Sequence, residues 1–369
     1  MKRYILLAAG ILFLRMPLWA GTGTTALSFL QENLNARLVG MAGAFSAAAQ
    51  GSEGILTNPA GVARPSLPEV NASHGAFQDQ SHQTQILYSH PFQFSNGRKI
   101  SVGGALNYFT AGKIDIFDSN GTLTASKKAE ESYAAGFCLS AEVFSFLSLG
   151  VTPKYISSKL LDQYLVSAFA ADVGGMVFPL PRYKDRLVLG AALQNVGSSV
   201  KYKDEQSNMP RTIALGLSGI PWEDDSRGSL LLTVQGEQIL RDKITYRLGG
   251  EYSFGRKGAR AFFLRGGTHL QSSESFSIGI GAREKRFSLD YAFVSVGDLE
   301  KTHRLTLVFR LGSPVWQEEK EETLVHVEEE KREPSREVLF EDDERRKKFR
   351  KSINKNAKDD SEYYLLKEK

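Results

Sequence analysis

The segment ITYRLGGEYSF, residues 244–254, alternates between apolar and polar side chains. Successive side chains of a β-strand point to opposite faces, so this period of two predicts a strand with one apolar and one polar face. The polar face carries Arg247 and Glu251 in mid-strand. Such charges cannot lie in a dry core, but they can face water in the lumen of a barrel or on the outside of a sandwich.

The same alternation recurs along most of the chain, and strand length favours the barrel. Sandwich strands usually run about 5–6 residues, whereas a tilted membrane-spanning strand needs about 9–11. The segments here are of the longer kind, and an even number returns both chain ends to the same side of a membrane. We count fourteen, at residues 68–77, 83–94, 98–110, 129–143, 146–158, 164–178, 185–196, 210–220, 228–239, 243–254, 260–270, 274–284, 286–296 and 302–311.

The sequence therefore predicts an all-β fold, an antiparallel transmembrane β-barrel of about 14 strands over residues 67–312. The longest connections, at residues 111–128 and 197–209, join odd strands to even ones, and several tight turns join even strands to odd ones. Short periplasmic turns and longer outer loops are usual in such barrels. Tyr252 and Phe254 near a strand end, and Trp316 just past the last strand, suit an interfacial aromatic girdle.

The N-terminus reads as an export signal followed by a compact apolar segment. Residues 1–20 hold a basic pair, an apolar run and a final small residue, which is typical of a secretory signal peptide. Residues 35–63, NARLVGMAGAFSAAAQGSEGILTNPAGVA, are rich in small side chains. Residues 37–50 could form one short helix, and Asn58 before Pro59 would then break the chain. We assign residues 21–66 to an N-terminal segment that contains a short helix.

Several motifs resemble the FadL-type outer-membrane proteins, most closely their PorV-type relatives. The pattern covers about residues 36–312 and includes the pieces LGAALQNVG (189–197), RLGGEYSF (247–254) and LDYAFVSVGDLEKTHRLTL (289–307). Its most specific part is an ARxxGMxGAF…NPAG pattern, carried by Ala36, Arg37, Gly40, Met41, Gly43, Ala44, Phe45, Asn58, Pro59, Ala60 and Gly61.

The resemblance implies a function and a set of site residues. It implies a barrel, with an N-terminal hatch in its lumen, that passes long-chain fatty acids or other hydrophobic small molecules across the outer membrane. The hatch residues would be Gly40, Met41, Gly43, Ala44, Phe45, Asn58, Pro59 and Ala60. A kink at Gly103 and Gly104 would form a lateral exit to the bilayer. Lumen contacts would come from Arg247, Glu251, Arg286, Asp290 and Arg304.

Two other functions fit the same pattern. A non-transporting scaffold or shuttle subunit of a secretion or surface-assembly system, similar to PorV, would use the modest loops and the charged tail. A purely structural surface protein is the third possibility. The expected partners are outer-membrane lipid, a hydrophobic small molecule and, through the C-terminal tail, a periplasmic or secretion-machinery partner.

The sequence lacks the patterns of catalytic or metal sites. No Walker A loop, H-E-x-x-H, G-x-S-x-G or paired-cysteine motif occurs, so we expect neither an enzyme nor a bound cofactor. His74, His82 and His90 lack accompanying carboxylates or cysteines, and Cys138, the single cysteine, has no base near it. Without the signal the net charge falls from +4 to about +1, which gives no attraction to nucleic acid.

Residues 313–369 form a tail of a different character. Residues 317–344 hold 13 acidic and 4 basic side chains, and residues 345–358 hold 8 basic and no acidic ones. Such a composition cannot build a core, so we expect a disordered or partly helical periplasmic tail. A contact arm for an anionic partner is the functional alternative.

Overall fold

The computed structural model describes residues 25–77, 80–183, 186–203, 205–224, 227–240, 242–256, 260–270, 275–296 and 301–313, together with Lys347. The predicted signal peptide, Trp316 and nearly all of the predicted tail lie outside these residues. No helix in the described part is long and apolar enough to cross a membrane.

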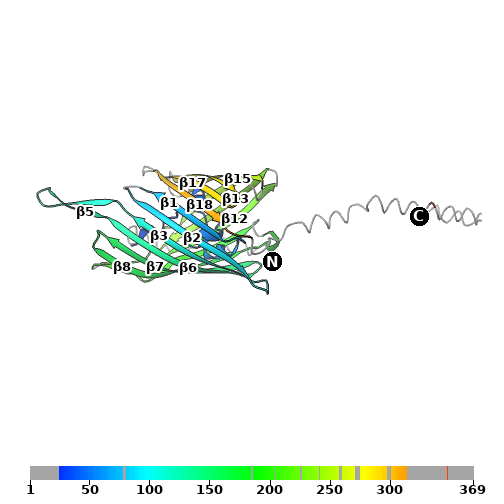
Figure 1. Cartoon of the computed structure of the whole chain (residues 1–369), viewed down its shortest axis with the longest axis horizontal. Coiled ribbons are helices and arrows are strands. Elements are labelled where there is room, and N and C mark those ends of the chain that lie inside the picture. Colours follow the sequence, from blue (N-terminus) through cyan, green and yellow to red (C-terminus); the bar gives the residue numbers. More distant parts are fainter. Residues whose placement is uncertain are drawn as a thin grey trace, which may run out of the picture. The chain divides into compact units, whose positions relative to one another are not determined.

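Fourteen antiparallel strands close into a single barrel, as the sequence predicts (Figure 1). Each strand of the wall pairs with the wall strands before and after it along the chain. β1 closes the ring on β18 through eight residue pairs, from Glu69↔Arg310 to Ala76↔His303. The wall consists of β1 (Glu69–Ala76), β2 (His82–Gln93), β3 (Lys99–Thr110), β6 (Glu130–Phe144), β7 (Leu147–Leu160), β8 (Tyr164–Val177), β9 (Val188–Gly197), β12 (Thr212–Asp224), β13 (Gly228–Ile239), β14 (Thr245–Arg256), β15 (Arg260–His269), β16 (Ser275–Glu284), β17 (Phe287–Val296) and β18 (Thr302–Arg310).

The two longest connections carry extra hairpins at the same end of the barrel. β4 (Lys113–Phe117) pairs with β5 (Leu123–Lys128), and β10 (Val200–Tyr202) pairs with β11 (Glu205–Ser207). The β4–β5 hairpin extends beyond the wall (Figure 1). We call this end of the barrel the loop end and the opposite end, with its tight connections, the turn end.

The outer surface of the wall is apolar. Aliphatic side chains point outward in mid-strand; Leu248 and Leu264, for example, are 40% and 53% exposed. Aromatic rings lie side by side at the turn end, where the centroids of Tyr252 and Phe254 are 6.0 Å apart and those of Phe254 and Phe262 are 5.5 Å apart. An apolar band with aromatic residues at its margin is the surface that a bilayer requires of a barrel.

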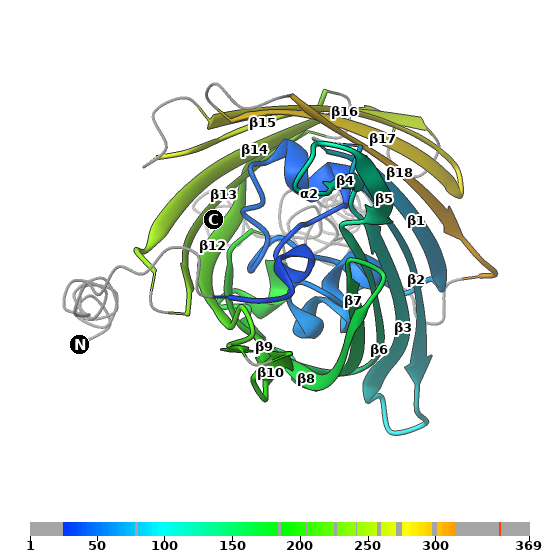
Figure 2. The same ribbon diagram turned by 90° about the vertical axis from the view of Figure 1, so that its left-hand side faces the viewer.

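The N-terminal segment, residues 25–66, lies inside the ring of strands (Figure 2). It contains three 3-10 helices, η2 (Ser28–Leu30), η3 (Gly51–Gly54) and η4 (Pro59–Ala63), and one short α-helix, α2 (Ala36–Gly40). A further 3-10 helix, η5 (Pro181–Tyr183), belongs to the connection between β8 and β9.

The helix in the N-terminal segment is shorter than the sequence predicts. A helix over residues 37–50 is wrong, because α2 ends at Gly40. Ala42 and Gly43 adopt φ values of 55° and 71°, in the left-handed region that a right-handed helix cannot include. Asn35 starts α2 by accepting a hydrogen bond from the Leu38 amide. Asn58 caps η4 in a similar way, by accepting from the Ala60 amide.

Candidate functional site in the barrel lumen

Glycines on the inner face of the wall let the N-terminal segment pack backbone against backbone. A Cβ on Gly249 would lie 2.5 Å from the Met41 carbonyl oxygen, and one on Gly267 would lie 2.5 Å from the Ala42 amide nitrogen. Gly190 faces the Ser46 carbonyl in the same way. Such contacts leave no room for a larger side chain, so the small residues of the segment match the small residues of the wall.

These contacts predict opposite outcomes for two adjacent glycines of β14. We expect Gly249→Val to displace the N-terminal segment, because its side chain would overlap the Met41 backbone. Gly250→Val is the matched control, since a Cβ there meets Leu232 Cδ2 and the Leu231 carbonyl oxygen at ordinary distances of 3.4 and 3.6 Å. Trypsin added to the detergent-solubilised protein should cleave after Arg37 in the first variant and spare that bond in the second. Equal protection of the two variants would contradict the packing described.

A chain of buried ion pairs fixes the segment to the wall. Arg37 of α2 bonds Glu53 of η3 and lies 3.0 Å from Glu251 of β14. Arg265 of β15 bonds Glu251 and Asp290 of β17, both at 2.6 Å. The Arg265 side chain is 2% exposed. Two arginines and three carboxylates, from the segment and three strands, are thus linked, and each carboxylate contacts at least one arginine.

The predicted lumen contacts are only partly brought together. Glu251 and Asp290 belong to this chain, whereas Arg247 pairs with Glu237 of β13 at 2.8 Å and Arg304 with Glu32 at 3.4 Å. Arg286, predicted as a lumen contact within the segment 286–296, does not lie in a strand. It precedes β17 in the exposed turn at Lys285, which has a left-handed φ of 51°.

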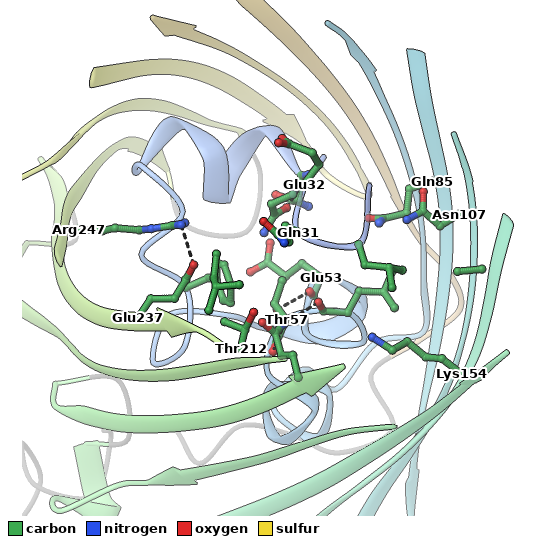
Figure 3. A pocket seen from close by; sticks show the side chains of 18 residues that line it. Gln31, Glu32, Glu53, Thr57, Gln85, Asn107, Lys154, Thr212, Glu237 and Arg247 are labelled. Atoms are coloured by element: carbon green, nitrogen blue, oxygen red, sulfur yellow. Dashed lines mark hydrogen bonds and ion pairs between the residues drawn. The ribbon is translucent and has the colours of Figure 1, made fainter. Parts of the chain in front are cut away.

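A small polar cavity remains between the segment and the wall (Figure 3). Arg247 and Lys154 enter it from opposite sides, with Glu53 and Thr57 of the segment between them. Lys154 is held by Asp172 of β8, 2.7 Å away and fully buried. The volume open to the centres of water molecules is about 50 Å³, and one water needs about 10–15 Å³ on that measure. The cavity therefore suits a few waters and is too small for a hydrocarbon chain.

An apolar lining covers the inner face of β6, β7 and β8 at the loop end. Leu27 and Phe29 of the N-terminal segment pack on it, and Phe29 stacks on Phe109 with ring centroids 6.0 Å apart. Water-filled barrels are polar inside, so this patch differs from the rest of the lumen. We call it the apolar inner wall, and it consists of Ala134, Ile156, Val166, Ala168 and Ala170.

The kink predicted at Gly103 and Gly104 is absent. β3 pairs without interruption with β2 and β6 through both glycines. Gly103 faces the lumen, where a Cβ would lie 2.7 Å from Ile55 Cδ1, and nothing lies within 4 Å of a Cβ on outward-facing Gly104. The pair therefore makes room for Ile55, and no lateral exit is formed there.

The remaining candidates for chemistry are separated. His74 and His82 stack on the outer face with ring centroids 5.7 Å apart, whereas His90 packs on Phe92. Within the described residues no cluster of metal-ligating side chains occurs. Cys138 is buried beside Ile55 and Val62 as a small core residue.

An apolar band on the outer face, a closed ladder of strands and buried ion pairs in the lumen together decide the class. The protein is an outer-membrane β-barrel. Closed strand ladders leave no unpaired backbone group to the lipid, which open sheets cannot achieve. Its lumen holds the chain's own N-terminal segment.

Comparisons with known proteins give similar barrels. No family model and no curated protein sequence matches the chain. Among solved structures, the Pseudomonas putida toluene transporter TodX has 10% identity and a TM-score of 0.48, over 71% of this chain and 94% of that one. The CymD monoaromatic hydrocarbon channel has 12% identity and a TM-score of 0.48, over 76% and 98%. Omp33 of Acinetobacter baumannii has 11% identity and a TM-score of 0.40, over 66% and 98%.

Proposed function

We propose that this barrel transports hydrophobic small molecules across the outer membrane, with long-chain fatty acids as the first candidates. The apolar inner wall carries this proposal. Ile156 and Val166 would not help an aqueous pore, because apolar side chains on the inner face do not bind water or ions. A hydrophobic solute entering from the loop end could bind to them in place of Leu27 and Phe29.

In this proposal the N-terminal segment acts as a hatch. A drug-sized ligand needs about 300–1,000 Å³ of pocket, far more than the polar cavity offers. The segment must therefore shift before a solute passes. Its hatch residues include Gly40, Met41 and Phe45, and the ion pairs of Arg37 tie it to the wall.

Uptake of labelled oleate by cells tests the proposal. The double variant Ile156→Thr with Val166→Thr places two hydroxyls on the apolar inner wall and shortens one side chain by a methyl group, and we expect uptake to fall on the order of tenfold. The matched control, Val151→Thr with Val173→Thr, makes similar changes on the outer face of the same two strands. It should transport normally. Undiminished uptake by cells that lack the protein would reject transport altogether.

A scaffold or shuttle subunit of a secretion or surface-assembly system is the second candidate. The many contacts that fix the N-terminal segment favour it, because a scaffold needs no opening. Purification in mild detergent with a stoichiometric partner, from cells whose oleate uptake does not depend on this protein, would select this function.

A further inference from the structure

Two arginines converge at the turn-end mouth of the lumen. Arg283 of β16 and Arg310 of β18 both point inward, on either side of Ser288 of β17. Arg283 lies directly across from Ser288 in the strand register, and Arg310 Nη1 donates a hydrogen bond to Ser288 Oγ at 2.9 Å. Both arginines are half-buried, so solvent from the mouth reaches them.

Arg283 has no carboxylate partner within 4 Å among the described residues, whereas Arg310 has one, Glu69, at 3.7 Å. Arg283 packs over the ring of Phe263, with 5.4 Å between its guanidinium carbon and the ring centroid, and no described acidic oxygen lies within 4 Å of it. Glu251 and Asp290, the nearest acids along the lumen, are bound by Arg37 and Arg265.

Arg310 forms only a long ion pair with Glu69, which is held mainly by Ser52. Oε1 of Glu69 accepts from the Ser52 amide at 2.7 Å and from the Ser52 hydroxyl at 2.8 Å. Its Oε2 lies 3.7 Å from Arg310 Nε, which is beyond hydrogen-bond distance. A guanidinium offers five N–H donors in a fork that matches a carboxylate or phosphate. Most donors of the two arginines are therefore unused by the described residues.

We propose that Arg283 and Arg310 bind the oxyanion headgroup of an amphiphile, a carboxylate or a phosphate, at the turn-end mouth. Two cations at the same mouth of the lumen repel each other, and an anion between them would relieve that repulsion and accept hydrogen bonds from their remaining donors. The Phe263 ring beside Arg283 supplies apolar surface for the first carbons of the chain. The inference rests on the proposed function, since it names the headgroup of the transported molecule.

Binding to the purified protein in an uncharged detergent tests the inference. The probes are oleate, its uncharged analogue oleyl alcohol, and inorganic phosphate as a competitor. We expect the wild type to prefer oleate, and Arg283→Gln with Arg310→Gln to weaken oleate binding at least about tenfold, with oleyl alcohol unaffected. Arg260→Gln is the matched control, because Arg260 is exposed at the same end and pairs with Glu284.

The remaining outcomes are also decisive. Lysine at both positions should restore part of the preference, because it keeps the charge but not the fork. Heat-dependent gel mobility identifies a variant that has not folded. An unchanged preference in the folded glutamine variant would overturn the proposal. If phosphate competes but the wild type binds oleate no better than oleyl alcohol, the two arginines bind a free oxyanion. That result would overturn the assignment to an amphiphile headgroup. Because binding is measured on purified protein, the result for the headgroup is independent of the result of the uptake assay.

Discussion

Removal of residues 35–63 should convert a closed barrel into an open pore. About eight strands already enclose all the space that side chains can fill, so a ring of fourteen is too wide to close by itself. The deleted residues supply α2, η3 and η4, which occupy the lumen. In planar bilayers the wild type should give almost no single-channel current, and the deletion, bridged by a short Gly-Ser linker, should give large steps of constant size.

A deletion outside the lumen is the control. Removing residues 114–127 takes away most of the β4–β5 hairpin, which lies beyond the wall, and should leave the current near zero. Retained heat-dependent mobility on a gel shows that each deleted barrel is closed. If the first variant folds and still conducts nothing, residues 35–63 are not what blocks the lumen.

Arg265→Met should be the most destabilising single change in the wall. The substitution removes the partner that Asp290 holds at 2.6 Å and one of the two partners of Glu251. Removal of one member of a buried ion pair lowers the free energy of unfolding by about 3–5 kcal/mol, because the remaining charge stays buried without a partner. The measurement is the urea midpoint of unfolding in detergent, followed by the change in gel mobility.

Arg260→Met on the same strand is the matched control for charge and side-chain length. Arg260 and Glu284 are 72% and 52% exposed, so the loss of that pair should cost at most about 1 kcal/mol. Adding Asp290→Asn to Arg265→Met should recover part of the lost stability, since no unpaired carboxylate then remains at Asp290. Equal midpoints for Arg265→Met and Arg260→Met would show that the buried chain contributes little.

The wall could be predicted from the sequence because the pattern that defines a strand lies within the strand itself. Alternation of polar and apolar residues fixes both the strand and the face on which each side chain lies, and the fourteen predicted segments coincide with the fourteen strands. The hairpins β4–β5 and β10–β11 were expected only as loops, since isolated two-stranded ribbons carry a weak pattern.

The contents of the lumen could be predicted only in part. Alternation places Glu251 and Asp290 on the inner face, but their partners Arg265 and Arg37 depend on a register between distant segments. Arg265 lies an even number of residues from Ala261 and Gly267, which face inward. Alternation alone therefore places Arg265 on the inner face as well. Gly103 illustrates the opposite problem. A glycine in a strand indicates a bend or a close neighbour equally well, and only the position of Ile55 decides between them.

The seam between β1 and β18 affects how the wall folds. Its eight residue pairs join stretches more than 200 positions apart, and β18 is the last strand of the wall to be synthesised. Of all the pairings in the wall, this seam has the largest separation in sequence, so it is the slowest to form on grounds of chain entropy. Until it forms, β1 and β18 each keep one unpaired edge, and such edges favour aggregation during folding.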